Sequence, residues 1–70
     1  MNYDELIIKI NNLIMEYKNN NKNKLYLMDT FVDNNGDIAN KLINYYQNIG
    51  VGINVHYCIR QNNFDIVLWW

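Results

Sequence analysis

The sequence predicts an α+β fold, a two-layer sandwich with the element order α-β-α-β-β, in which two helices pack on one face of a three-stranded sheet. Three observations lead to this expectation. Apolar residues recur every three or four positions in residues 3–17 and again in 38–49, as on one face of a helix. From residue 51 the apolar period changes to two, and residues 25–32 form a short apolar run between polar clusters, both typical of strands. With 70 residues, of which 50% are hydrophobic, the chain is expected to form one small domain over residues 1–70.

The first helix is expected to begin after Asn2, because Asn2 followed by Glu5 resembles a capping box. Its buried stripe is predicted to contain Tyr3, Leu6, Ile7, Ile10, Leu13, Ile14 and Tyr17. Ile8 and Met15 lie off this stripe, seven residues apart. They are interpreted either as the margin of a wide buried face or as a contact for a partner.

The next segment, LYLMDTFV, covers residues 25–32 and has the apolar and aromatic content of a strand. Its nearly continuous hydrophobicity favours a central strand or one covered on both faces. DNNGD, residues 33–37, then predicts a turn leading into the second helix, with Asp37 or an Asn just before it as the N-cap. A calcium loop is excluded there, because placing Gly36 sixth would put Phe31 first and Leu42 twelfth.

The second helix is predicted to run from about Ile38 to Ile49. Gly50 follows it and suits a left-handed C-terminal cap. The core stripe of this helix is predicted to contain Ile38, Leu42, Tyr45 and Ile49, widened by Ala39, Ile43 and Tyr46.

Two alternating segments around QNN, residues 61–63, predict a C-terminal β-hairpin. A two-residue turn at Asn62 and Asn63 would pair Ile59 with Ile66, so that apolar residues meet on one face of the hairpin. The face toward the helices is then predicted to carry Val55, Tyr57, Ile59, Ile66, Leu68 and Trp70.

In this register the two final tryptophans separate. Trp70 would lie opposite Val55 and point into the core, whereas Trp69 would lie opposite His56 and point outward. On that second face, Arg60 would lie opposite Asp65. We expect neither helix to cover this face, which is predicted to carry Asn54, His56, Cys58, Arg60, Asp65, Val67 and Trp69.

His56 and Cys58 are the only residues of types that commonly act as nucleophile and base. They lie two positions apart on one predicted strand, which separates them by roughly 7 Å and is poor geometry for proton transfer. A metal site would need a further ligand such as Asp65. Asp29, Asp33 and Asp37 recur every four residues but are explained by caps and turns. We therefore expect no catalytic residue, no metal and no cofactor.

Composition narrows the class of partner. Six basic and seven acidic residues give a net charge of −1, which is too balanced for binding nucleic acid through its phosphates. A single cysteine fits a reducing compartment, and the N-terminal sequence has neither the charge pattern of a signal peptide nor a membrane-spanning run. A cytoplasmic protein is expected. Asparagine occurs fifteen times, and its codons are A/T-rich, which is weak evidence for a low-G+C bacterium or one of its phages.

The resulting hypothesis is a small non-enzymatic protein-interaction module, such as a phage or mobile-element inhibitor of a bacterial enzyme or defence complex. Because exposed Trp and Arg are enriched at interaction hot spots, the predicted partner-binding residues are Trp69, His56, Arg60, Val67, Asn54 and Asp65. Self-association through the Trp69 face, or through an open edge strand such as the last one, fits the same hypothesis. The alternative is a nucleotide- or RNA-binding protein that uses Trp69, His56 and Arg60.

Overall fold

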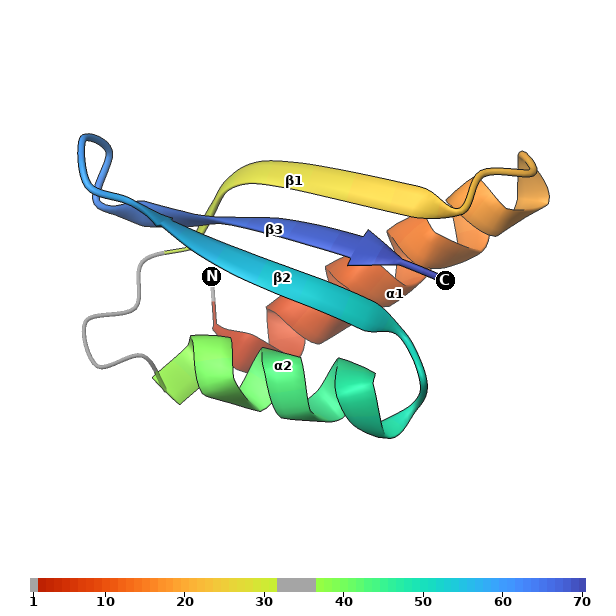
Figure 1. The fold of residues 1–70 in the computed structure, drawn as a ribbon, viewed down its shortest axis with the longest axis horizontal. Helices are drawn as coiled ribbons and strands as arrows, with labels where there is room; N and C mark the ends of the chain where they lie inside the picture. Colours follow the sequence, from red (N-terminus) through yellow and green to blue (C-terminus); the bar gives the residue numbers. More distant parts are fainter. Residues whose placement is uncertain (1, 32–36) are drawn as a thin grey trace.

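Two helices lie against one face of a three-stranded antiparallel sheet, as Figure 1 shows for the computed structural model. The structure describes residues 2–31 and 37–70. The elements follow the order α1 (Tyr3–Asn19), β1 (Lys24–Phe31), α2 (Asp37–Asn48), β2 (Gly52–Cys58) and β3 (Asn63–Trp69). The predicted fold class and element order are confirmed. The turn predicted at residues 33–36 lies outside the described residues.

Helix α1 begins where the sequence predicts. The Asn2 side chain accepts a hydrogen bond from the Glu5 backbone N–H at 2.8 Å, which satisfies one of the free donors at the helix N-terminus. Leu6, Ile10 and Ile14 are buried, as expected from their four-residue spacing. Both off-stripe residues, Ile8 and Met15, are exposed.

Both helices end in the same backbone motif. After α2, Gly50 has a φ of +81°, its N–H bonds the Gln47 carbonyl, and the Val51 N–H bonds the Tyr46 carbonyl. This pair of bonds is a Schellman motif, and it confirms the predicted glycine cap. After α1, Asn21 takes the left-handed conformation with a φ of 60°, and the equivalent bonds join Asn21 to Lys18 and Lys22 to Tyr17.

The buried stripe of α2 is centred on Ala39, Leu42 and Tyr46 rather than on the predicted Ile38, Leu42, Tyr45 and Ile49. Ile49 is 57% exposed, so its predicted core position is wrong. The reason is that α2 ends at Asn48 and the Schellman motif turns the chain toward β2 immediately afterwards.

The order of strands in the sheet is β1-β3-β2, so the last strand is the central one. Both neighbours of β3 run antiparallel to it. The expectation that residues 25–32 form a central or doubly covered strand is wrong, and so is the suggestion that the last strand lies at an edge. Strand β1 lies at one edge of the sheet. It is also covered on one face alone, because Leu25 is buried whereas the alternate residues Tyr26 and Met28 are exposed.

The hairpin register differs from the prediction by four residues. Strands β2 and β3 pair Cys58 with Asn63, Tyr57 with Phe64 and Val55 with Ile66, which leaves residues 59–62 as a four-residue loop. The predicted turn at residues 62–63, and every pairing that follows from it, is therefore wrong. Because four is even, each side chain of the paired residues 52–58 and 63–69 still points to the face that the alternation predicts.

Contacts at the loop explain the longer connection. The rings of Tyr57 and Phe64 pack with centroids 5.1 Å apart, which the shorter turn would prevent. The Tyr57 hydroxyl donates to Asn62 Oδ1 at 2.6 Å, and Asn62 has the left-handed φ of 53° that asparagine tolerates. Ile59 consequently lies in the loop, 82% exposed, and not in the core.

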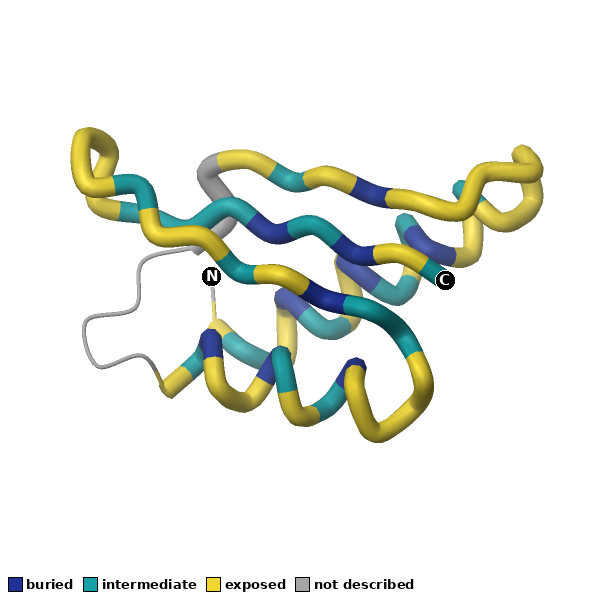
Figure 2. Tube along the Cα trace, in the orientation of Figure 1, coloured by how far each residue is buried: buried dark blue, intermediate teal, exposed yellow. Residues whose placement is uncertain are grey.

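The core lies between the helices and the inner face of the sheet. Among the described residues, the largest fully buried side chains there are those of Leu6, Ile10, Leu25, Leu42, Tyr46, Ile66 and Leu68. Figure 2 shows these buried positions distributed along the helices and along the strands. Trp70 packs against this core but is only partly buried. Its indole N–H donates to the Lys22 carbonyl at 3.0 Å and its backbone N–H to the Asn23 carbonyl at 3.0 Å, so Trp70 closes the connection between α1 and β1.

Candidate functional site

The face of the sheet that points away from the helices, called the outer face here, brings together five of the six predicted partner-binding residues. Strand β3 contributes Asp65, Val67 and Trp69, and β2 contributes Asn54 and His56. In Figure 1 both helices lie on the other side of the sheet, and no described element covers the outer face. The sixth residue, Arg60, lies in the hairpin loop.

Strand pairing sets the order of side chains across this face. Trp69 lies between Lys24 and Gly52 in one row, and Val67 lies between Tyr26 and Asn54 in the next. A third row pairs Asp65 with His56. The predicted neighbour of Trp69 was His56, so the shifted register replaces an imidazole with a glycine beside the indole ring.

The absence of a side chain at Gly52 has a direct structural role. A Cβ placed there would meet Trp69 Cε2 and Nε1, and would lie 2.6 Å from Trp69 Cδ2. The indole ring therefore lies over the backbone of β2, where any other residue would obstruct it. Trp69 remains 46% exposed, so its other ring face is open to solvent.

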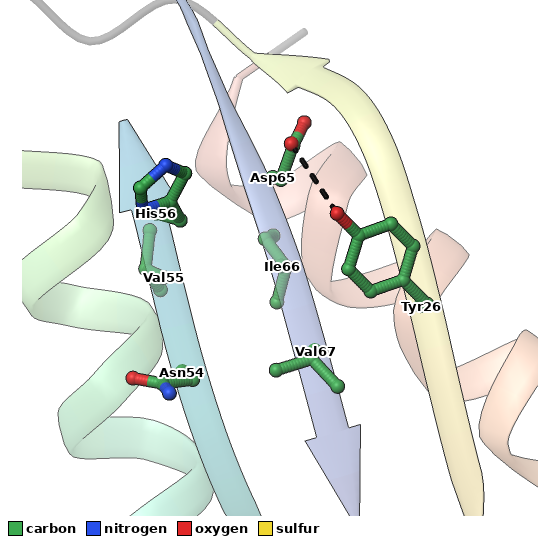
Figure 3. Close-up of a pocket in the computed structure, with 7 residues that line it drawn as sticks. All are labelled: Tyr26, Asn54, Val55, His56, Asp65, Ile66 and Val67. Atoms are coloured by element: carbon green, nitrogen blue, oxygen red, sulfur yellow. Dashed lines mark hydrogen bonds between the residues drawn. The ribbon is translucent and has the colours of Figure 1, made fainter. Parts of the chain in front are cut away.

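Strand β1 adds two large side chains that are not among the predicted site residues. Tyr26 is 56% exposed and Met28 is 64% exposed. The alternation of Leu25 and Leu27 with Tyr26 and Met28 was the available signal, but an apolar run gives no indication of which face is covered. The Tyr26 hydroxyl reaches Asp65 Oδ2 in a long hydrogen bond of 3.5 Å, drawn in Figure 3.

A shallow hollow of about 160 Å³ lies in the middle of the outer face (Figure 3). It is lined by Tyr26, Asn54, Val55, His56, Asp65, Ile66 and Val67. Small-molecule sites are typically about 300–1,000 Å³ and enclosed. This hollow is too small for a nucleotide and suits a single protruding side chain.

Arg60 is remote from Trp69. The Gly52–Trp69 pair lies at one end of the hairpin, and Arg60 lies in the loop beyond the Cys58–Asn63 pair at the other end. Six strand residues at about 3.3 Å each separate the two ends by roughly 20 Å. The predicted pairing of Arg60 with Asp65 is wrong, because Asp65 lies opposite His56.

His56 and Cys58 lie two positions apart on β2, as predicted, and Cys58 is half-buried. No three His, Cys, Asp or Glu side chains lie close enough to hold a metal ion in the part of the chain that the structure describes.

Tyr46 has the one strongly shifted pKa among the described groups, and it lies in the core. Burial raises the pKa of its hydroxyl well above the usual value, with smaller contributions from Tyr45 and Tyr3. That hydroxyl donates to Asn11 Oδ1 at 2.9 Å, and the Asn11 amide donates to the Tyr45 hydroxyl at 3.4 Å. The polar group is thus satisfied between the two helices, in a structural role.

A second hollow, of about 300 Å³, lies between the helices on the side opposite the outer face. It is lined by Asn11, Ile14, Met15, Lys18, Tyr45, Tyr46, Ile49 and Val51. Two exposed apolar residues contribute to it. Met15 has an unbranched side chain with several rotatable bonds, and Ile49 lies just beyond the end of α2. This hollow is therefore a less preorganised surface than the ring of Trp69 over Gly52.

Comparison of the chain with models of protein families, with curated proteins and with solved structures found no match. Within residues 2–31 and 37–70, neither helix has the length and apolar character needed to cross a membrane.

Proposed function

We propose that this protein is a non-enzymatic interaction module that binds another protein through the outer face of its sheet. The observation that carries the proposal is the half-exposed ring of Trp69, held over Gly52 on the central strand. Trp is the residue most enriched at binding hot spots, and an ordered ring loses little conformational entropy on binding.

The surroundings of Trp69 support this proposal. Tyr26, Met28 and Val67 extend the apolar surface along β1 and β3. Asn54, His56 and Asp65 supply polar groups beside it. An apolar centre bordered by polar side chains is the usual anatomy of a protein–protein interface. The hollow between Tyr26 and His56 would receive one side chain of the partner.

The arrangement favours a protein partner over a nucleotide or RNA. Stacking on Trp69 would need nearby positive charge to hold the phosphates, yet Arg60 lies at the opposite end of the hairpin. Lys24 lies opposite Trp69 on β1, but a single paired lysine on a chain with a net charge of −1 provides little affinity for phosphates. Nucleic-acid binding is therefore the less favoured alternative, and RNA-binding measurements test it.

The partner we propose is a cytoplasmic bacterial enzyme or defence complex, and the role is that of a phage or mobile-element inhibitor. This part of the proposal rests on the 70-residue length and on the composition typical of A/T-rich codons.

The test is affinity capture from a lysate of a low-G+C bacterium, with bound proteins identified by mass spectrometry. We expect Trp69→Ala to lose the partner and Ile59→Ala to retain it, since Ile59 is more exposed but lies off the outer face. The purified partner should then lose activity when the wild-type protein is added and keep it when Trp69→Ala is added.

A comparator separates the two surfaces of the molecule. Ile49→Asp would place a charge in the hollow between the helices and leave the outer face unchanged. Loss of the partner with Ile49→Asp but not with Trp69→Ala would contradict the proposed site. Salt-sensitive RNA binding that is lost in Arg60→Ala would contradict a protein partner altogether.

A further inference from the structure

Strand β2 presents a regular open edge. It pairs with β3 over all seven residues without a shift, and β3 is its one strand neighbour among the described residues. The other edge of the sheet is irregular, because the pairing of β1 with β3 shifts between Leu27 and Phe31. A regular edge strand has a row of backbone N–H and C=O groups that a further strand can pair with.

The sequence of β2 lacks the features that usually protect such an edge. GINVHYC contains no lysine, arginine, aspartate, glutamate or proline, and no bulge interrupts it. Natural edge strands are normally blocked by one of these devices. Tyr57 and Val55, on the inner face of this strand, also retain exposed surface that a neighbouring strand would cover.

We infer that β2 pairs antiparallel with β2 of a second copy of this chain, about a two-fold axis at Val55. This register uses all seven residues and pairs Ile53 with the second copy's Tyr57 and Asn54 with its His56. In this register, odd-numbered residues pair with odd-numbered residues and even-numbered with even-numbered, as an antiparallel pair of identical strands requires. This holds whether the odd or the even residues direct their backbone N–H and C=O groups toward the open edge. An axis at Asn54 or His56 would leave two residues of each strand unpaired.

Charge favours the same arrangement. Strand β2 contains no lysine, arginine, aspartate or glutamate, so self-pairing brings no fixed like charges together. Helix α2 contacts β2 from within the chain, and its charged residues are Asp37 and Lys41, one of each sign. The pairing joins two sheets into one of six strands, an isologous interface of the kind most common among homodimers. It does not depend on what the outer face binds.

Cysteine cross-linking tests the register. In a Cys58→Ser background, Asn54→Cys and His56→Cys chains are prepared separately, one with a tag that changes its mass. Directly opposed Cβ atoms lie about 4.5–5.5 Å apart across a strand pair, close to what a disulfide needs. We expect mild oxidation of the mixture to give a mixed disulfide, and each chain alone to give little. Self-linking of either chain without the mixed product would overturn the axis at Val55.

The oligomeric state supplies the second readout. Wild-type protein is expected to sediment at about twice its 8.4 kDa mass. The double variant Asn54→Lys, His56→Lys is expected to sediment as a monomer, because each new lysine would lie opposite a lysine of the second copy. The control, Asn12→Lys with Asn19→Lys, adds the same charges on exposed positions of α1 and should remain dimeric. A monomeric wild type, or a dimer that survives both lysines on β2 while circular dichroism shows a native fold, would overturn the inference.

Discussion

The indole ring of Trp69 on the central strand lies over the backbone of Gly52 on its neighbour, in the space that a Cβ would occupy. The glycine therefore determines where the ring lies, and the ring covers the one position of β2 without a side chain. This relationship makes the proposed binding surface sensitive to a single methyl group.

Gly52→Ala is the sharpest test of that relationship. The new methyl group would overlap the ring and force Trp69 to another position, while no positive φ opposes alanine at this residue. Because loss of a hot-spot residue commonly costs about 2 kcal/mol or more of binding free energy, affinity for the captured partner should fall about thirtyfold or more. Tryptophan fluorescence should report the changed environment of the ring. Unchanged affinity would mean that the partner does not contact Trp69 in this position.

The matched control is Gly50→Ala. Nothing lies within 4 Å of a Cβ at Gly50, but its φ of +81° is unfavourable for alanine. The free energy of unfolding should fall by about 1–2 kcal/mol, measured by urea denaturation, with partner affinity retained. The two glycines thus separate a loss of binding from a loss of stability.

The two tryptophans should differ in their effect on stability. Trp70 packs against the core and donates to the Lys22 carbonyl, but it is only partly buried. Trp70→Ala should therefore lower the free energy of unfolding by about 2 kcal/mol, less than the roughly 3–5 kcal/mol expected for a fully buried ring. Trp69→Ala should cost about 1 kcal/mol or less, because nearly half of that side chain is exposed. Both losses are measured by urea denaturation in the monomeric Asn54→Lys, His56→Lys background. Equal losses in the free energy of unfolding would contradict the assignment of the two rings to opposite faces.

Tyr46 predicts a loss of stability in alkali. Burial raises its pKa in the folded state above the ordinary value of about 10, so the unfolded chain releases this proton first as the pH rises. The contribution is complete below about pH 10 and falls above it, by up to about 1.4 kcal/mol per pH unit. Tyr46→Phe should remove this part of the slope and, by leaving Asn11 Oδ1 without its donor, lower the stability at neutral pH by about 1–2 kcal/mol. An identical alkaline slope in Tyr46→Phe and wild type would contradict the prediction.

Arg60 should prove dispensable for the proposed interaction. It lies in the hairpin loop, roughly 20 Å along the strands from Trp69. Arg60→Ala is therefore expected to leave the affinity for the captured partner within about twofold, as measured by surface plasmon resonance. An affinity loss of about tenfold or more would instead mean that the interface extends over the loop.

Side-chain periodicity was sufficient to predict the helices and the two faces of the hairpin. The Leu6, Ile10 and Ile14 stripe and the outward direction of Trp69 follow from spacing alone, because a helix repeats every 3.6 residues and a strand every two. For the same reason, five of the six residues predicted for the site lie on one face.

Pairing partners could not be obtained in that way. A shift of four residues preserves the face of every side chain that stays in a strand, so alternation cannot distinguish a two-residue turn from the observed four-residue loop. The choice depends on the contact of Tyr57 with Phe64 and on the hydrogen bond from Tyr57 to Asn62. The predicted position of Arg60 opposite Asp65 is wrong for this reason, and alternation does not predict Gly52 as the neighbour of Trp69. The order of strands was equally hidden, because Tyr26 and Met28 are apolar yet exposed.

The central position of β3 also constrains how the chain is made. Strands β1 and β2 do not pair with each other, and both depend on β3, which is the last of the five elements in chain order. A ribosome releases the chain from its N-terminus, so the sheet cannot assemble until residues 63–69 have left the exit tunnel. Until then, two helices and two unpaired strands expose the surfaces that will form the core. Formation of the sheet therefore waits for β3, because both other strands need it as their partner.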